Sequence, residues 1–282
     1  MPDKPILALM YDFDRTLSPK DMQEYAFIPG LGMESKEFWA ECDSTMHKHG
    51  MDQILAYMLV MLEKSEGRQL VTHDTLKALG KGVKLFCGVK TWFHRINSYA
   101  DKQGLMAEHY IISSGLKEII EGTLIAGEFK EIYAASFCYN EKGVPYWPAM
   151  AVNYTSKTQF LYRINKGVMD VSENKGLNEY MPEDRRRVPF RNMIYIGDGL
   201  TDVPCMKLTK ANGGHSIAVY QENKKEANDM LLHGRVDYAV NSDYSKGSEM
   251  ELAVFEIIDQ VAATARAVKR QMEHYDLAKK EL

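Results

Sequence analysis

The stretch ILALMYDFDRTL, residues 6–17, indicates the fold class of this 282-residue chain. Its apolar first half and acidic second half are typical of a buried strand that ends in a polar loop. The stretches HYIISSG at 109–115 and MIYIGDGLTD at 193–202 repeat this arrangement. Between them lie segments with helical spacing. Short apolar strands that alternate with helices predict an α/β fold, a Rossmann-like parallel sheet with helices on both faces.

The region that follows the first strand departs from this alternation. Apolar residues from Met51 to Leu62 recur at helical spacing, and Phe38 and Trp39 belong to another predicted helix that ends near Gly50. We therefore expect an inserted helical domain at residues 18–88. The α/β core would then be discontinuous and consist of residues 1–17 and 89–282.

Composition and charge exclude several kinds of partner. The chain has 35 basic and 39 acidic residues, a net charge of −4, so we expect no nucleic-acid partner. No apolar run approaches the roughly 20 residues of a membrane-spanning helix, so we expect no membrane contact. The four cysteines are widely spaced and form no CxxC pair, which favours a reduced, cytoplasmic protein. The oligomeric state stays open.

Carboxylates gather at the predicted strand ends. Asp12 and Asp14 follow the first strand, and Asp198 and Asp202 follow the third. The carboxyl ends of parallel strands meet at one edge of a sheet, so these groups are expected to converge. Four carboxylates in one cleft repel one another unless a cation is present, and Mg²⁺ prefers oxygen ligands of this kind. The sequence therefore predicts a magnesium site.

A phosphoryl group is the natural ligand of such a site, because metal, backbone N–H groups and a lysine all bind phosphate. The turn Ser113-Ser114-Gly115 supplies hydroxyl and backbone groups at the end of the second strand. Lys157, near the start of a predicted helix, is the candidate cation. Taken singly each motif is weak, and their order and their strand context strengthen the prediction.

In this order, YDFDRTL, IISSG, the lysine of NYTSKT and IYIGDGLTD resemble the four motifs of the haloacid dehalogenase-like (HAD) hydrolase superfamily. The resemblance covers nearly the whole chain. The helical insert is similar to the cap domain of the phosphoserine-phosphatase-like branch. The resemblance implies that Asp12 is the nucleophile that forms an aspartyl-phosphate, and that Asp14 is the general acid and base.

The resemblance also implies the roles of the other motif residues. Thr16, Ser113, Ser114, Gly115 and Lys157 would form the phosphate-binding set, with Thr16 bracing the loop that carries the acid. Asp198 would bind Mg²⁺ together with Asp12 and the backbone carbonyl of Asp14. Asp202 would either bind the metal or hold Lys157.

The sequence gives less information about substrate specificity. Arg15 replaces the small or apolar residue common in the family, and it is expected either to contact a substrate anion or to pair with a carboxylate of the insert. Asp21 and Glu24 are candidates for the acidic residue with which phosphoserine phosphatases grip their substrate. The apolar helix at 51–62 offers no arginine for the carboxylate of phosphoserine, which argues against that substrate.

The expected activity is the Mg²⁺-dependent hydrolysis of a small phosphorylated metabolite. Two alternatives remain open at this stage. One is a phosphotransferase or phosphomutase of the same family, and the other is a non-catalytic protein that binds a metabolite on this scaffold. The identity of the substrate cannot be inferred from the sequence.

Overall fold

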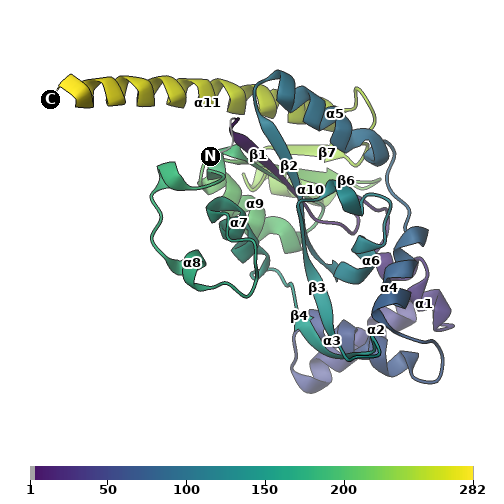
Figure 1. The fold of residues 1–282 in the computed structure, drawn as a ribbon. Coiled ribbons are helices and arrows are strands. Elements are labelled where there is room, and N and C mark those ends of the chain that lie inside the picture. The colour runs from purple at the N-terminus through teal and green to yellow at the C-terminus, as the bar shows by residue number, and fades with distance from the viewer. Residues whose placement is uncertain (1–3, 282) are drawn as a thin grey trace.

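A seven-stranded sheet forms the centre of the molecule (Figure 1), in a computed structural model that describes residues 4–281. The strand order is β4-β3-β2-β1-β5-β6-β7. All neighbouring strands are parallel except β3 and β4, which form the antiparallel hairpin at one edge. The strands are β1 (Ile6–Tyr11), β2 (Met106–Leu116), β3 (Glu131–Tyr139), β4 (Pro145–Met150), β5 (Met193–Gly197), β6 (His215–Tyr220) and β7 (Tyr238–Asn241).

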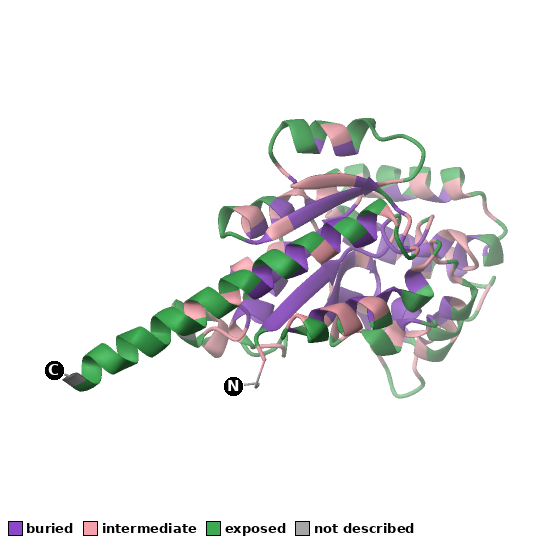
Figure 2. Ribbon diagram, turned by 90° about the horizontal axis from the view of Figure 1, so that it is seen from above, coloured by how far each residue is buried: buried purple, intermediate pink, exposed green. Residues whose placement is uncertain are grey.

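Helices cover both faces of this sheet, as the alternation of elements predicts. One core contains Leu7, Leu9 and Tyr11 of β1 and is closed by α5 (Val89–Lys102), α6 (Lys117–Glu121) and α11 (Glu249–Glu281). The other contains Ala8 and Met10 and is closed by α7 (Lys157–Lys166), α9 (Val203–Ala211) and α10 (Lys225–Leu232). Successive residues of a strand point to opposite faces, so a wholly apolar β1 fits a strand that is buried on both sides (Figure 2).

A helical block separates β1 from α5. It consists of η1 (Met22–Glu24), α1 (Phe27–Gly30), α2 (Ser35–His49), α3 (Gln53–Ser65), α4 (His73–Leu79) and η2 (Gly80–Gly82). Gly50 ends α2 in the left-handed conformation, with φ of 59°. The carboxylate of Asp52 then accepts hydrogen bonds from the backbone N–H groups of Ile54 and Leu55, which fixes the start of α3.

The helical block is packed closely on the sheet and its helices. α4 lies against α6 so tightly that a Cβ on Gly122 would overlap the carbonyl oxygen of Lys77. At the other side, Asn153 Nδ2 donates to Asp52 Oδ2 at 2.8 Å, and the backbone N–H of His73 donates to Gly143 O in the β3–β4 hairpin. These contacts fix the block to α6, to the loop before α7 and to the β3–β4 hairpin.

The remaining helices are short, apart from α11. They are η3 (Ala126–Glu128), α8 (Lys175–Asn178), η4 (Glu183–Arg185), η5 (Phe190–Asn192) and η6 (Leu200–Asp202). α11 packs on the sheet with its first half, and its second half projects beyond the rest of the molecule (Figure 1). Within residues 4–281, no helix combines the length and the apolar character needed to cross a membrane.

Candidate active site

Strands β1, β2 and β5 lie side by side, and their carboxyl ends open into a cavity of about 550 Å³. Nine of the residues singled out in the sequence line it: Asp12, Asp14, Arg15, Asp21, Ser113, Ser114, Gly115, Lys157 and Asp198. Thr16, Glu24 and Asp202 lie behind this lining and contact it through side chains described below. The parallel sheet thus brings together motifs that are separated by up to 190 positions along the chain, from Asp12 to Asp202.

Lys157 occupies the centre of a buried ion-pair cluster. Its Nζ lies 3.0 Å from Asp12 Oδ1 and 2.7 Å from Asp202 Oδ1, and the lysine has no exposed surface. Burial alone would lower the pKa of Lys157, but the two carboxylates outweigh it and raise the pKa above its ordinary value. Burial raises the pKa of Asp12 to about 6, against the opposing attraction of Lys157. The lysine is therefore held in its charged form.

The other two carboxylates lack a basic partner of this kind. Burial raises the pKa of Asp14 well above its usual value, and the nearby charges of Asp21 and Asp12 raise it further. Burial and the charge of Asp12 act in the same way on the pKa of Asp198. Asp14 Oδ1 accepts a hydrogen bond from the backbone N–H of Met22 at 2.8 Å, so its carboxyl is fixed in direction. The site holds more carboxyl groups than its cations can pair.

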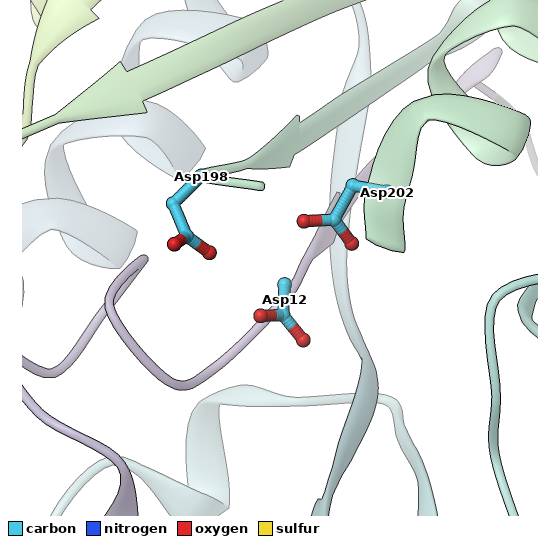
Figure 3. Close-up of side chains that lie close together, drawn as sticks. All are labelled: Asp12, Asp198 and Asp202. Carbon is cyan, nitrogen blue, oxygen red and sulfur yellow. The ribbon is translucent and has the colours of Figure 1, made fainter. Parts of the chain in front are cut away.

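One carboxylate oxygen from each of Asp12, Asp198 and Asp202 lies within 4.8 Å of the others (Figure 3). The three side chains come from the loop after β1, the loop after β5 and η6. Oxygen donors with an excess of negative charge are the ligands that hard divalent cations prefer. Thr16 Oγ1 donates to Asp198 Oδ1 at 3.3 Å and so orients this group. The donor set fits a hard divalent cation.

The end of β2 contributes another part of the cavity wall. The backbone N–H of Gly115 donates to Ser113 Oγ at 3.1 Å, and Ser114 Oγ is buried without a hydrogen-bond partner. A Cβ on Gly115 would lie 2.1 Å from Met22 Cε and 2.9 Å from Asp14 Oδ2, so a larger residue here would require these two side chains to move. Hydroxyl groups and a backbone turn therefore lie in the cavity wall next to the carboxyl group of Asp14.

A model of the haloacid dehalogenase-like hydrolases matches residues 9–207, which is more than two thirds of the chain. The chain belongs to the haloacid dehalogenase-like hydrolase family. A curated relative, an uncharacterized protein of Borreliella burgdorferi, is 27% identical over 273 residues, which cover 87% of this chain and 94% of the relative.

Two solved structures show which HAD fold this is. A HAD family hydrolase of Salmonella enterica serovar Typhi superimposes with a TM-score of 0.57 at 16% identity, over 90% of this chain and 72% of that one. A substrate-bound phosphoserine phosphatase superimposes with a TM-score of 0.51 at 12% identity, over 84% and 93% of the two chains. The chain therefore has the phosphoserine-phosphatase-like HAD fold that its motifs predict.

In this HAD site, the carboxylate of Asp202 accepts hydrogen bonds from other groups of the protein. Besides Lys157, Tyr195 donates its hydroxyl to Asp202 Oδ1 at 2.8 Å, and Asp202 is fully buried. The sequence does not indicate a role for Tyr195 in the site, because a tyrosine within an apolar strand is typical of a core residue. No local sequence signal marks Tyr195, because its role depends on the contact with Asp202.

The backbone of Arg15 has a positive φ of 59°, a conformation that residues other than glycine rarely adopt. Its Nε and Nη2 lie 3.2 and 3.1 Å from the two oxygens of Asp21. Of the two alternatives for Arg15, the structure shows the pairing with a carboxylate of the helical block. Glu24 does not line the cavity, and its carboxylate instead accepts a hydrogen bond from Trp39 Nε1 at 3.1 Å.

The outer part of the cavity is formed by residues that the sequence did not reveal. Trp39 of α2, Tyr57 of α3 and Gln23 of η1 line it from the helical block, and Tyr154 lines it from the loop before α7. Their spacing within the helices matches that of ordinary core residues, so the pattern alone could not separate them. Aromatic residues are no more frequent in residues 18–88 than in the whole chain, so composition gives no signal either.

Proposed function

We propose that this HAD hydrolase is a Mg²⁺-dependent phosphatase that hydrolyses a small phosphorylated metabolite through an aspartyl-phosphate. The observation that supports this most strongly is the position of Lys157, whose Nζ lies 3.0 Å from Asp12 at the wall of the cavity. An ammonium group beside a carboxylate offsets the charge that repels a phosphate dianion from a carboxylate nucleophile.

In the first step, a carboxylate oxygen of Asp12 attacks phosphorus while the bond from phosphorus to the leaving alcohol breaks. Asp14 gives its proton to the leaving oxygen, and its raised pKa favours the protonated form that this requires. In the second step, Asp14 takes a proton from a water molecule, whose oxygen attacks the phosphorus. Inorganic phosphate leaves and both carboxyl groups return to their starting states.

The surrounding residues position the phosphoryl group. Lys157 and the Ser113–Gly115 turn hold its oxygens, and Asp202 keeps Lys157 in place from the buried side. Asp12 and Asp198, with the backbone carbonyl of Asp14, would hold the magnesium ion. When bound, Mg²⁺ neutralises charge on the phosphoryl oxygens and aligns them for in-line attack.

We further propose that residues 18–88 act as a cap over a core formed by residues 1–17 and 89–282. Two helices of this block, α2 and α3, supply side chains to the cavity wall. A cap that closes over the substrate excludes bulk water from the first step. The four free cysteines among the described residues agree with a protein of the cytoplasm.

The direct test is hydrolysis of p-nitrophenyl phosphate by the purified protein, with and without Mg²⁺. We expect turnover that chelation abolishes, and we expect Asp12→Asn to lower kcat at least about 10³-fold while the circular dichroism spectrum stays unchanged. Asp276→Asn, in the exposed part of α11, is the matched control and should keep full activity. Full activity of Asp12→Asn, or activity in the presence of excess chelator, would contradict the mechanism.

Mass spectrometry separates hydrolysis from its alternatives. A phosphatase transfers the phosphoryl group from Asp12 to water, whereas a phosphotransferase or phosphomutase passes it to a hydroxyl group. We expect ¹⁸O from labelled water in the released phosphate at all concentrations of added alcohol. Binding of phosphorylated compounds without turnover would instead support a metabolite-binding protein.

A further inference from the structure

The outer wall of the cavity contains two aromatic rings that contact each other edge to face. The ring centroids of Trp39 and Tyr57 are 6.3 Å apart, and their planes meet at 75°. The polar end of each ring is already used, because Trp39 Nε1 donates to Glu24 Oε1 and the Tyr57 hydroxyl donates to Ser114 O at 2.8 Å. These hydrogen bonds hold the rings in place, and the surface they add to the cavity is mainly the ring itself.

Gln23 adds a polar group to the same wall. Its side chain lines the cavity and the residue is only 2% exposed, yet its amide oxygen has no hydrogen-bond partner. A buried carbonyl oxygen without a hydrogen-bond donor is destabilising. A ligand with an N–H or O–H group would relieve this cost.

Acidic side chains outnumber basic side chains in the wall of the cavity. Its lining contains the carboxyl groups of Asp12, Asp14, Asp21, Asp43 and Asp198, but among the described residues only two basic side chains line it. Arg15 is paired with Asp21, and Lys157 is paired with Asp12 and Asp202. Asp43, at the exposed rim, lies 3.5 Å from His47 and has no lysine or arginine partner among these residues. No free cation is left for a second anionic group on the substrate.

From this juxtaposition we propose that the leaving group of the substrate carries an ammonium group, so that the substrate class is the phosphate monoesters of amino alcohols. The inference rests on the proposed phosphatase function. A cation is attracted to the faces of Trp and Tyr rings, and the carboxylates beside these rings add to the attraction. Gln23 accepts a hydrogen bond from the N–H of a primary ammonium.

The same wall disfavours two other leaving groups. A flat nucleobase stacks between parallel rings, whereas Trp39 and Tyr57 stand nearly perpendicular to each other. The carboxylate of phosphoserine needs a cation, but Arg15 is paired with Asp21, and Lys157 is paired with Asp12 and assigned to the phosphoryl group. A leaving group with an amine, but with neither a flat base nor a carboxylate, avoids both of these conflicts.

The test compares esters that differ only in charge. We expect kcat/KM for phosphoethanolamine to exceed that for n-propyl phosphate at least about tenfold, and phosphocholine to exceed its neutral isostere 3,3-dimethylbutyl phosphate by a similar factor. Tetramethylammonium should inhibit the hydrolysis of phosphocholine competitively. Nucleoside monophosphates and phosphoserine should be poorer substrates than phosphoethanolamine.

Three variants assign the effect to the wall. Trp39→Leu should reduce both charge ratios to about twofold or less, whereas Trp147→Leu, an exposed tryptophan of β4 outside the cavity, should leave them unchanged. Gln23→Met should lower kcat/KM for phosphoethanolamine about fivefold or more and leave phosphocholine, which has no N–H, within about twofold. The neutral esters report whether each variant is still folded and active.

The outcomes separate the inference from the proposed function. If the protein hydrolyses the neutral esters as fast as their charged counterparts, the inference is wrong and the phosphatase proposal stands. A preference for nucleoside monophosphates or phosphoserine over phosphoethanolamine would likewise contradict the inference and leave the phosphatase proposal standing. If the wild type hydrolyses no ester, p-nitrophenyl phosphate included, the proposed function is wrong and the inference falls with it.

Discussion

Tyr11 and Asp12 are successive residues at the end of β1, and their side chains enter two very different buried networks on opposite faces of the sheet. On the first face, Trp92 Nε1 donates to the Tyr11 hydroxyl at 3.0 Å, and this hydroxyl donates to His109 Nδ1 at 3.0 Å. His109 Nε2 in turn donates to Asn97 Oδ1 at 2.9 Å. Every member is neutral, and each donor along the chain has an acceptor.

On the second face, Asp12 contacts Lys157, which also contacts Asp202, and Asp198 lies close by. This network contains one cation and several carboxyl groups. Its charges do not balance within the protein, so its full stabilisation needs a further cation and a substrate anion. The comparison teaches that a satisfied buried network is structural, whereas a network that the protein leaves incomplete marks the place of a ligand.

Replacing the lysine is the most severe way to test this difference. Lys157→Met removes the cation between Asp12 and Asp202, and we expect kcat/KM for p-nitrophenyl phosphate to fall at least about 10³-fold. Lys175→Met, at an exposed lysine of α8, is the control and should keep wild-type kinetics. A Lys157→Met enzyme within about tenfold of the wild type would show that the charged network is structural too.

The neutral network should respond in the opposite manner. Tyr11→Phe leaves the Trp92 N–H and His109 Nδ1 without a partner, and we expect the free energy of unfolding to drop by about 2–3 kcal/mol. The kcat of the folded fraction should stay within about twofold of the wild type, although the next residue is Asp12. Urea titration followed by circular dichroism measures the stability. A large loss of kcat would break the separation of the two networks.

Acid should weaken the neutral network as well. Burial lowers the pKa of His109 from 6.5 to about 3, so below pH 6.5 the unfolded chain binds a proton that the folded protein refuses. The resulting loss of stability grows by about 1.4 kcal/mol per pH unit between these pKa values and amounts to about 2 kcal/mol at pH 5. His109→Gln should flatten this dependence. An equal slope in the variant and the wild type would refute the assignment.

The charged network should couple metal binding to protons. Burial raises the pKa of Asp12 to about 6 and that of Asp198 well above its usual value, so an incoming cation competes with protons for these two carboxyl groups. We expect the apparent affinity for Mg²⁺ to fall by up to about tenfold from pH 7 to pH 6, with protons released on binding. Calorimetry in two buffers of different ionisation enthalpy measures both quantities. An affinity independent of pH would indicate that these carboxyl groups are ionised without metal.

The sequence predicts the part of this site that follows from strand topology. Asp12 and Asp198 each follow a strand and Ser113 lies near the end of one, and parallel strands that neighbour one another must bring their carboxyl ends together. Lys157 adds a helix start whose position depends on the same sheet. The fold class and the helical insert could also be predicted, because they are encoded in local periodicity.

What the sequence does not predict depends on contacts between elements. Gln23 and Trp39 acquire their meaning only from the way the helical block is placed on the sheet, and Tyr195 only from the hydroxyl that it directs at Asp202. The positive φ of Arg15 likewise has no signature in composition. Nothing in the local sequence distinguishes such residues from ordinary core and surface positions, so their roles emerge only from the assembled structure.

The length of α11 has a consequence for how the molecule moves in solution. A helix of 33 residues is about 50 Å long, and residues 269–280 at its distal end are exposed on all sides. A rod of this kind increases hydrodynamic drag and makes rotational diffusion anisotropic, with slower tumbling about the axes perpendicular to the helix. Sedimentation velocity should accordingly give a frictional ratio above that of a sphere of 32.2 kDa, and removal of residues 269–282 should lower it.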